Sequence, residues 1–298
     1  MKNNLYDIDF LTKEEVYIAP NRNMRPFNYK NPKNSDIAKE SLSNCPFCDK
    51  DKIGDLVIEN GTVRIIENKY PAIPKGYGEQ FVMVTDYDHY LKLEDREWEY
   101  TYNALLTLRD FYNSIKDRFT HVQIFKNEGN LSGATLYHCH WQVTALKRNS
   151  PKNMTIYNSM KEYKEEYGFD YFNENNKDLY VVDDSGSTVL FAPCASKANL
   201  MCRIYSKRKV NSYGDLTVAE LESFAKKIRK LILAYKDIYK DFSYNILFND
   251  FNNLDEGYFY IEIMPRIGKF GGFELSTNAY FTVGYGEKTQ SVLSEYFV

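Results

Sequence analysis

The chain has 298 residues, enough for one large or two moderate domains with a hydrophobic core. Its formal net charge of −3 gives no electrostatic reason to expect nucleic acid or an anionic membrane as a partner, and no apolar run is long enough to cross a bilayer. The five cysteines, an odd number in a long chain, do not indicate a disulfide framework. Because the N-terminus also lacks the apolar core of a signal peptide, we expect a cytoplasmic protein.

A short predicted strand near the N-terminus runs into two arginines. Residues 17–26 read Tyr-Ile-Ala-Pro-Asn-Arg-Asn-Met-Arg-Pro, so Arg22 and Arg25 follow the strand directly. Guanidinium groups bind phosphates and base edges through a fixed fork of N–H donors. The segment therefore predicts a phosphate- or base-binding pair, although a solvated loop accounts for the same residues.

Two cysteines follow in the sequence Cys45-Pro-Phe-Cys48. A Cys-x-x-Cys turn presents two thiolates to a single metal ion. The alternative is a redox pair, which usually follows a strand and opens a helix. The flanks here are polar and irregular, which favours a zinc knuckle. A tetrahedral site needs two further ligands, and the chain has only four histidines to supply imidazoles.

A hairpin is predicted over residues 56–66, with its turn at Asn60 and Gly61. It leads into a polar loop in which Asn68 comes shortly before Pro71. That loop is either a substrate-contacting segment or an ordinary connection.

The next elements are a strand over residues 81–84, which ends in a corner at His89, and a long helix. Apolar residues over 93–119 recur at spacings of three, four and seven, which predicts one apolar helix face. A strand over 121–125 then leads to the segment with the clearest chemistry.

That segment, residues 127–142, joins a loop of small residues to a strand. On a strand, residues two apart share a face, so His138, His140 and Gln142 are expected to point the same way. The loop before them contains Gly129 and Gly133, and such loops let backbone N–H groups approach a phosphate. An imidazole facing a phosphate suggests nucleophilic attack on phosphorus. The alternative is a half-buried strand with two hydrogen-bonded histidines.

The second half repeats the first in its order of elements. After a polar helix and connector over 151–178, the order strand, helix, strand, loop, strand of residues 81–146 recurs. The predicted boundary lies near Asn176, which gives halves 1–176 and 177–298. Overlaying them places Tyr258 opposite His138, Tyr260 opposite His140 and Glu262 opposite Gln142. The second half therefore lacks an equivalent of the candidate nucleophile.

These motifs resemble the active-site signature of the galactose-1-phosphate uridylyltransferases, which belong to the histidine-triad superfamily. The resemblance rests chiefly on Asn-x-Gly at 127–129 and His-x-His-x-Gln at 138–142. It implies an α+β fold of two histidine-triad-like halves, each an antiparallel sheet with a packed helix. It also implies that His140 is the nucleophile and that Gln142 supports it. The hydrolase branch carries a third histidine at this last position, which favours transfer. Cys139 departs from the pattern, because the family commonly has proline there.

The resemblance further implies a zinc site and a nucleotide site. The family's Pro-Asp-His corner corresponds to residues 87–89, which makes His89 the third ligand and His138 the fourth beside Cys45 and Cys48. The residues implied to contact nucleotide or phosphate are Arg22, Arg25, Asn68, Asn127, Gly129, Gly133 and Thr135.

The sequence thus predicts a nucleotidyltransferase that acts through a covalent nucleotidyl-histidine. Its expected partners are a nucleotide sugar and a sugar 1-phosphate or phosphate. Because the second half has lost its histidines, we expect a sugar specificity different from that of the galactose enzyme. A phosphorylase or hydrolase of the same fold and a non-catalytic nucleotide-binding relative remain as alternatives. The base, the acceptor and the subunit count stay open, a homodimer included.

Overall fold

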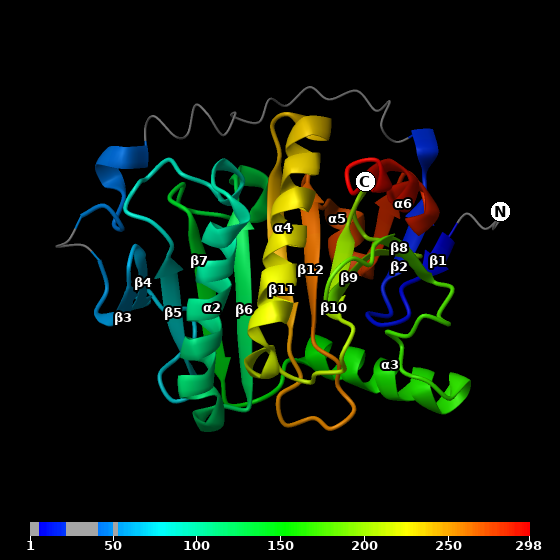
Figure 1. Cartoon of the computed structure of the whole chain (residues 1–298), viewed down its shortest axis with the longest axis horizontal. Coiled ribbons are helices and arrows are strands. Elements are labelled where there is room, and N and C mark those ends of the chain that lie inside the picture. Colours follow the sequence, from blue (N-terminus) through cyan, green and yellow to red (C-terminus); the bar gives the residue numbers. More distant parts are fainter. Residues whose placement is uncertain (1–5, 22–40, 50–52) are drawn as a thin grey trace.

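The computed structural model describes residues 6–21, 41–49 and 53–298, and within them the chain forms a ten-stranded and a three-stranded sheet. The large sheet has the order β3-β4-β5-β7-β6-β11-β12-β10-β9-β8 (Figure 1). Every neighbouring pair in it is antiparallel. Helices and antiparallel strands are combined in one body, so the predicted α+β class is confirmed.

The large sheet consists of five strands from each predicted half. Those of the first half are β3 (Leu56–Asn60), β4 (Val63–Glu67), β5 (Gly78–Val84), β6 (His121–Glu128) and β7 (His140–Leu146). Those of the second half are β8 (Leu179–Asp183), β9 (Thr188–Pro193), β10 (Cys202–Ser206), β11 (Ser243–Asn249) and β12 (Tyr260–Arg266). The two sets join where β6 pairs with β11. The halves therefore share one continuous sheet.

Two long helices, α2 (Trp98–Ile115) and α4 (Val218–Tyr239), lie side by side on one face of the sheet (Figure 1). Their apolar faces and the strand residues that point toward them form the main core, in which Trp141 is fully buried. α4 begins at the predicted capping box of Thr217 and Glu220. The helix predicted over 93–119 is interrupted, because Arg96 and Glu97 have extended backbone between a 3-10 turn and α2.

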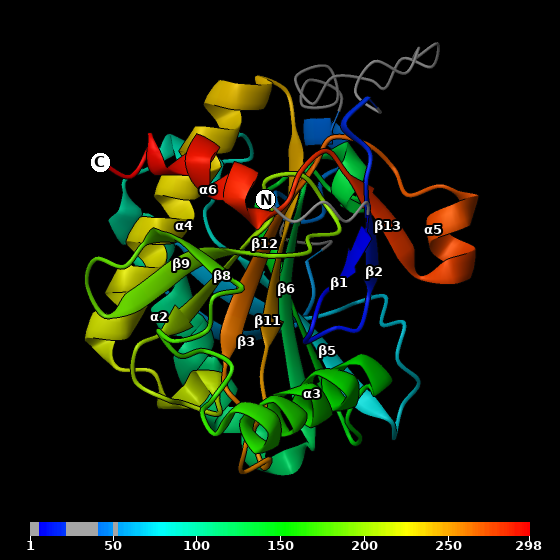
Figure 2. The ribbon, with the colours of Figure 1, turned by 90° about the vertical axis from the view of Figure 1, so that its right-hand side faces the viewer.

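The opposite face of the sheet carries the remaining layer (Figure 2). It contains α3 (Pro151–Tyr167), α5 (Gly272–Thr277) and the small sheet of β1 (Tyr6–Ile8), β2 (Glu15–Ile18) and β13 (Ala279–Thr282). The last helix, α6 (Gly286–Ser294), packs beside β8. Among the described residues, no helix is long and apolar enough to cross a membrane.

The two halves have matching strand registers. Both β7 and β12 have seven residues, Gln142 pairs with Phe125 on β6, and Glu262 pairs with Leu247 on β11. This agrees with the overlay of Tyr260 on His140 made from the sequence. The division into halves at residue 176 stays a prediction.

Candidate functional site

A cluster of two cysteines and two histidines lies beside the start of β7. Cys45 and Cys48 come from the turn before β3, His89 follows β5, and His138 precedes β7. One ligand atom from each lies within 4.8 Å of all the others. The Cys48 Sγ atom is 3.5 Å from Nδ1 of His89 and 3.4 Å from Nδ1 of His138. The four residues predicted as ligands are therefore brought together in a group that could hold a metal ion.

Hydrogen bonds outside the cluster orient both rings. Nε2 of His138 lies 2.8 Å from the carbonyl oxygen of Asp86, and Nε2 of His89 lies 2.7 Å from the Ser41 hydroxyl. A carbonyl accepts only from a protonated nitrogen, so Nδ1 of His138 is left unprotonated and faces the thiols. Metal-ligating histidines typically make such a hydrogen bond with the ring nitrogen that does not face the metal. Burial, together with Cys45, raises the pKa of the Cys48 thiol to about 11. A divalent cation would supply the charge that favours both thiolates.

His140 is the first residue of β7 and points away from the α2–α4 layer. Its Nδ1 atom lies 2.7 Å from the carbonyl oxygen of His138, so Nδ1 carries the proton and Nε2 keeps its lone pair. Burial, and then the charge of Lys126, lowers the pKa of His140 to about 4. The ring is therefore a neutral imidazole whose free nitrogen can act as a nucleophile or a base.

The His140 ring lines a cavity of about 320 Å³. Gln142 of β7, Gln80 of β5 and Thr135 of the preceding loop also line it, together with the loop after β4 and the Cys-x-x-Cys turn. Phe47, between the two cysteines, lies with its ring centroid 5.3 Å from that of His140. A polar end at the imidazole and apolar walls are typical of small-molecule sites.

The predicted phosphate loop is held by contacts within the protein. Gly129 and Gly133 have positive φ values of 80° and 87°, which suit glycine. Between them a 3-10 turn spans Asn130–Ser132. The Leu131 amide donates to Ser243 over 3.0 Å, and the Ala134 amide donates to Ser132 over 3.3 Å. Those two amides are therefore engaged by the protein itself, which leaves fewer of the loop's N–H groups for a phosphate.

The residues predicted to bind nucleotide or phosphate are only partly gathered. Asn68 and Thr135 line the cavity together with His140 and Gln142. Asn127, Gly129 and Gly133 are not among its lining residues. Arg22 and Arg25 lie outside the described residues.

Asn127 instead joins the two halves. Its Oδ1 atom accepts a hydrogen bond of 2.8 Å from Nδ2 of Asn245 on β11, which also donates to the Ser132 carbonyl over 2.9 Å. Arg266 donates to Oδ1 of Asn245 over 3.1 Å. The sequence reasoning missed these contacts, as it missed Phe47 and Gln80. Phe47 had a signal in the sequence, its place between two candidate ligands, whereas nothing in the local sequence marked Gln80 or Asn245.

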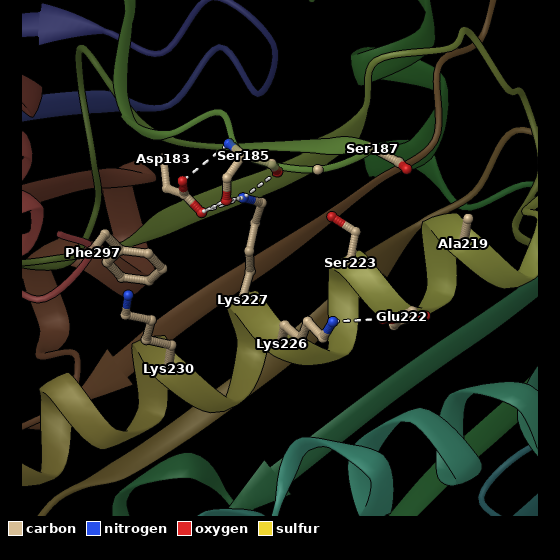
Figure 3. Close-up of a pocket in the computed structure, with 11 residues that line it drawn as sticks. Asp183, Ser185, Ser187, Ala219, Glu222, Ser223, Lys226, Lys227, Lys230 and Phe297 are labelled. Atoms are coloured by element: carbon tan, nitrogen blue, oxygen red, sulfur yellow. Dashed lines mark hydrogen bonds and ion pairs between the residues drawn. The ribbon is translucent and has the colours of Figure 1, made fainter.

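A larger cavity of about 570 Å³ lies on the outer side of α4 and carries no comparable chemistry (Figure 3). Its charged groups mostly neutralise one another. The ammonium of Lys227 contacts the Asp183 carboxylate and the Ser185 carbonyl, and Lys226 pairs with Glu222. Its lining contains neither histidine nor cysteine. The cavity at His140 is therefore the candidate site because of the chemistry of its lining residues, although the cavity beside α4 is larger.

Comparisons with known proteins show which sequences and folds the chain is similar to. Residues 27–149 match the family model described as the N-terminal domain of a domain of unknown function, DUF4931. The chain is 24% identical to an ADP-glucose phosphorylase of Arabidopsis thaliana over 321 residues, which cover 96% of this chain and 91% of that protein. It is also 24% identical to a galactose-1-phosphate uridylyltransferase of Kluyveromyces lactis over 127 residues, or 41% of this chain and 34% of that one.

A solved structure matches over nearly the whole length. The crystal structure of an Arabidopsis thaliana ADP-glucose phosphorylase with bound ADP-glucose superposes with a TM-score of 0.86 at 23% identity, and the match covers 97% of both chains. Together with the matched sequences, this likeness confirms the resemblance inferred from the motifs.

Proposed function

We propose that this chain, whose fold is that of the galactose-1-phosphate uridylyltransferase-like proteins, transfers a nucleotidyl group from a nucleotide sugar through a covalent intermediate on His140. The observation that carries the proposal is the orientation of this ring. Its Nδ1 proton is directed to the His138 carbonyl, 2.7 Å away, while the ring lines the cavity. A buried neutral imidazole with one free nitrogen suits in-line attack on phosphorus.

The reaction consists of two displacements. Nε2 of His140 attacks the α-phosphorus of the donor, and the bond from that phosphorus to the bridging oxygen breaks. The sugar 1-phosphate leaves with the electron pair of the broken bond. An acceptor phosphate oxygen then attacks the same phosphorus, the P–N bond breaks, and His140 returns to its neutral state. Little covalent chemistry is left to other residues, so positioning and charge stabilisation dominate.

Gln142 is the neighbour suited to the phosphoryl oxygens. It shares the face of β7 with His140 and lines the same cavity. Its amide can donate a hydrogen bond to an oxygen that gains negative charge in the transition state. An amide is too weak a base to take a proton from water at neutral pH, so Gln142 gives an attacking water no general-base help. This supports transfer to a phosphate over hydrolysis.

We further propose that the donor is an adenine nucleotide sugar and that the acceptor is phosphate. The matched ADP-glucose phosphorylase covers 96% of this chain, whereas the matched uridylyltransferase covers 41%. In such a phosphorolysis ADP-glucose and phosphate give glucose 1-phosphate and ADP. The expectation from sequence of a specificity other than that of the galactose enzyme is consistent with this choice.

We propose zinc as the ion held by Cys45, Cys48, His89 and His138. Two thiolates and two imidazoles form the closed tetrahedral set that structural zinc sites use. Zinc there would contribute folding energy and would fasten the Cys-x-x-Cys turn to the strand that carries His140. It takes no step in the reaction.

We also propose that the chain works in a reducing cytoplasm and that it is divided into halves 1–176 and 177–298. All five cysteines are free of disulfides, which supports the first. The matching registers of β7 and β12 support the second. A homodimer stays open, and sedimentation of the purified chain would decide it.

One experiment tests the reaction. The purified chain is incubated with ADP-glucose and phosphate, with UDP-glucose and galactose 1-phosphate, and with each donor in water alone. We expect ADP and glucose 1-phosphate from the first mixture, and a protein heavier by one AMP group when phosphate is withheld. Efficient UDP-galactose formation would overturn the specificity but keep the chemistry. Hydrolysis that needs no phosphate would identify a hydrolase, and binding without products a non-catalytic relative.

A further inference from the structure

A buried group of charges lies behind β7, here called the catalytic strand because it begins with His140, on the face opposite to the His140 side chain. Lys126 shares a face of β6 with the core residue Ile124, two positions earlier, so its side chain is directed toward the layer of α2 and α4. The Lys126 ammonium is 2.8 Å from the Glu128 carboxylate, which is also 2.8 Å from the ammonium of Lys92. The side chains of these three residues are at most 10% exposed.

Both lysines also bind the backbone that carries the candidate nucleophile. Nζ of Lys126 lies 3.3 Å from the carbonyl oxygen of His140 and 3.2 Å from Sγ of Cys139. Nζ of Lys92 contacts the carbonyl oxygen of Tyr137 and lies 3.5 Å from the centre of the Tyr137 ring. The ammonium groups therefore hold both ends of the four-residue stretch 137–140.

The two inner carbonyls of that stretch are held as well. The Thr85 hydroxyl lies 3.4 Å from the carbonyl oxygen of Cys139, and the His138 carbonyl accepts from the His140 ring. Each carbonyl from Tyr137 to His140 thus has a side-chain partner. Because the His138 carbonyl fixes the ring of His140, a shift of this backbone would also shift Nε2.

Such a network is costly as a source of stability alone. Burying two ammonium groups and one carboxylate incurs desolvation that their attraction often only offsets. Burial opposes ionisation of Glu128, yet the charges of Lys126 and Lys92 lower its pKa to about 2. The carboxylate therefore stays charged and keeps both ammonium groups in place. A fixed geometry is the property that such networks can supply.

We propose that Lys126, Glu128 and Lys92, here called the lysine–glutamate clamp, position the catalytic strand so that Nε2 of His140 meets the α-phosphorus in line. The clamp touches no substrate and acts through the backbone. It also gives Cys139 a role, since the thiol at this departure from the family pattern contacts Lys126. The proposal rests on the proposed function, so its test includes a measurement that does not depend on turnover.

The primary variant is Lys126→Met, which removes the ammonium but keeps the length of the side chain and leaves Glu128 paired with Lys92. The matched control is Lys197→Met in the other half. Lys197 is also buried, with a side chain 6% exposed, and bridges Glu14 at 3.2 Å and Glu262 at 3.3 Å. After its removal each carboxylate keeps another cation, Lys152 at 3.2 Å and Arg203 at 3.1 Å respectively.

We expect kcat of Lys126→Met to fall about 10- to 100-fold below that of Lys197→Met, because small misplacements of reacting atoms cost this much. KM for the nucleotide sugar should stay within about twofold and zinc content should be unchanged, since neither depends on the in-line geometry. Equal kcat values in Lys126→Met and Lys197→Met would overturn the proposal.

Nitrogen NMR of protein labelled in its histidine rings gives the second readout. We expect the Nδ1–H tautomer of His140 in the wild type and in Lys197→Met, and a mixture of tautomers in Lys126→Met. If the wild type turns over no donor, the proposed function fails, and the tautomers still decide the clamp: a single tautomer in Lys126→Met overturns it. Should Lys126→Met not fold, Lys92→Met replaces it, because that change leaves the Lys126–Glu128 pair neutral and intact. Its kcat and its His140 tautomers are then compared with those of Lys197→Met in the same way.

Discussion

His140 directs its Nδ1 proton to the backbone carbonyl of His138, 2.7 Å away, while the ring of His138 directs its own Nδ1 toward the two cysteine thiols. Two histidines separated by one residue therefore use the same ring nitrogen for different purposes. In His140, the proton on Nδ1 leaves Nε2 free for substrate. In His138, Nδ1 itself is the free atom, and it faces the thiols of Cys45 and Cys48.

This division predicts that His140→Ala abolishes the covalent adduct and reduces turnover by at least about 10⁴-fold, because no other group can form the intermediate. Zinc content and melting temperature should stay close to wild type. Mass spectrometry of the AMP adduct, elemental analysis and calorimetry measure the three quantities. Turnover near the wild-type rate would contradict nucleophilic catalysis at this residue.

Removal of a thiol from the cysteine–histidine cluster should lower the stability of the fold before it affects the reaction. Cys45→Ala is expected to lose the metal and to destabilise the chain by more than about 4 kcal/mol, since metal binding is coupled to folding. Cys202→Ala provides the comparison, because Cys202 is equally buried but lies on β10, outside the cluster. That variant should keep one zinc per chain. Equal metal content in the two variants would refute the assignment.

In the second half, Tyr260 occupies the place that His140 has in the first, but it is not expected to take part in the reaction. Its hydroxyl is buried and has no hydrogen-bond partner among the residues that the structure describes. Tyr260→Phe should therefore leave turnover unchanged and alter stability by less than about 1 kcal/mol, because it removes a polar group that has no partner. Thermal unfolding and the phosphorolysis assay check both expectations. Loss of the covalent adduct in this variant would show that the second half takes part in the chemistry.

Glu262 is the counterpart of Gln142. In contrast to the loss of the Tyr260 hydroxyl, the loss of the Glu262 charge should lower the stability of the chain strongly. Glu262 bonds Arg203 over 3.1 Å and Lys197 over 3.3 Å in a buried network. Glu262→Gln leaves these cations with less compensation and should cost about 3–5 kcal/mol of stability. Urea denaturation measures the loss, and kcat per folded molecule should stay near wild type. A loss below about 1 kcal/mol would show that the network contributes little.

Asp250 gives the stability a dependence on pH. It accepts hydrogen bonds from Tyr112, Tyr213 and Asn252, yet burial raises its pKa to about 6. The contribution of a group whose pKa is raised on folding is complete below its unfolded pKa of about 4, and it is lost as pH rises through about 6. Two pKa units correspond to about 3 kcal/mol.

Asp250→Asn removes this titration. Urea denaturation should show that the stability advantage of the wild type over Asp250→Asn is largest below about pH 4 and shrinks by about 3 kcal/mol by pH 7. A difference that is constant with pH would mean that the pKa of this carboxyl is not raised.

The cysteine–histidine cluster and the fold class were within reach of the sequence because short motifs carry a family resemblance, and that resemblance implied both His89 and His138 as further ligands and the α+β class. A Cys-x-x-Cys turn and a His-x-His strand each identify themselves locally. The hydrogen bond from Asn245 to Asn127 joins residues 118 positions apart, and no local pattern announces it. The break at Arg96 and Glu97 was also missed, because apolar spacing continues across it.

The buried charges were the hardest part to predict. Lys126 and Glu128 alternate with less buried positions on β6, and charged residues in a strand are ordinarily assigned to a solvated face. Their burial follows from the pairing of β6 with β11 and from the helices above, which is tertiary information. The same holds for Lys197 and Glu262 in the second half.

The seam between β6 and β11 has a consequence for any attempt to divide the protein. A fragment ending at residue 176 would retain the cysteine–histidine cluster and His140, but it would leave the hydrogen-bonding edge of β6 bare along the positions that pair with β11. Exposed edges recruit other strands. Since β6 and β11 run antiparallel, the β6 edges of two such fragments can pair about a new twofold axis. The isolated fragment should therefore assemble with itself in place of the missing second half.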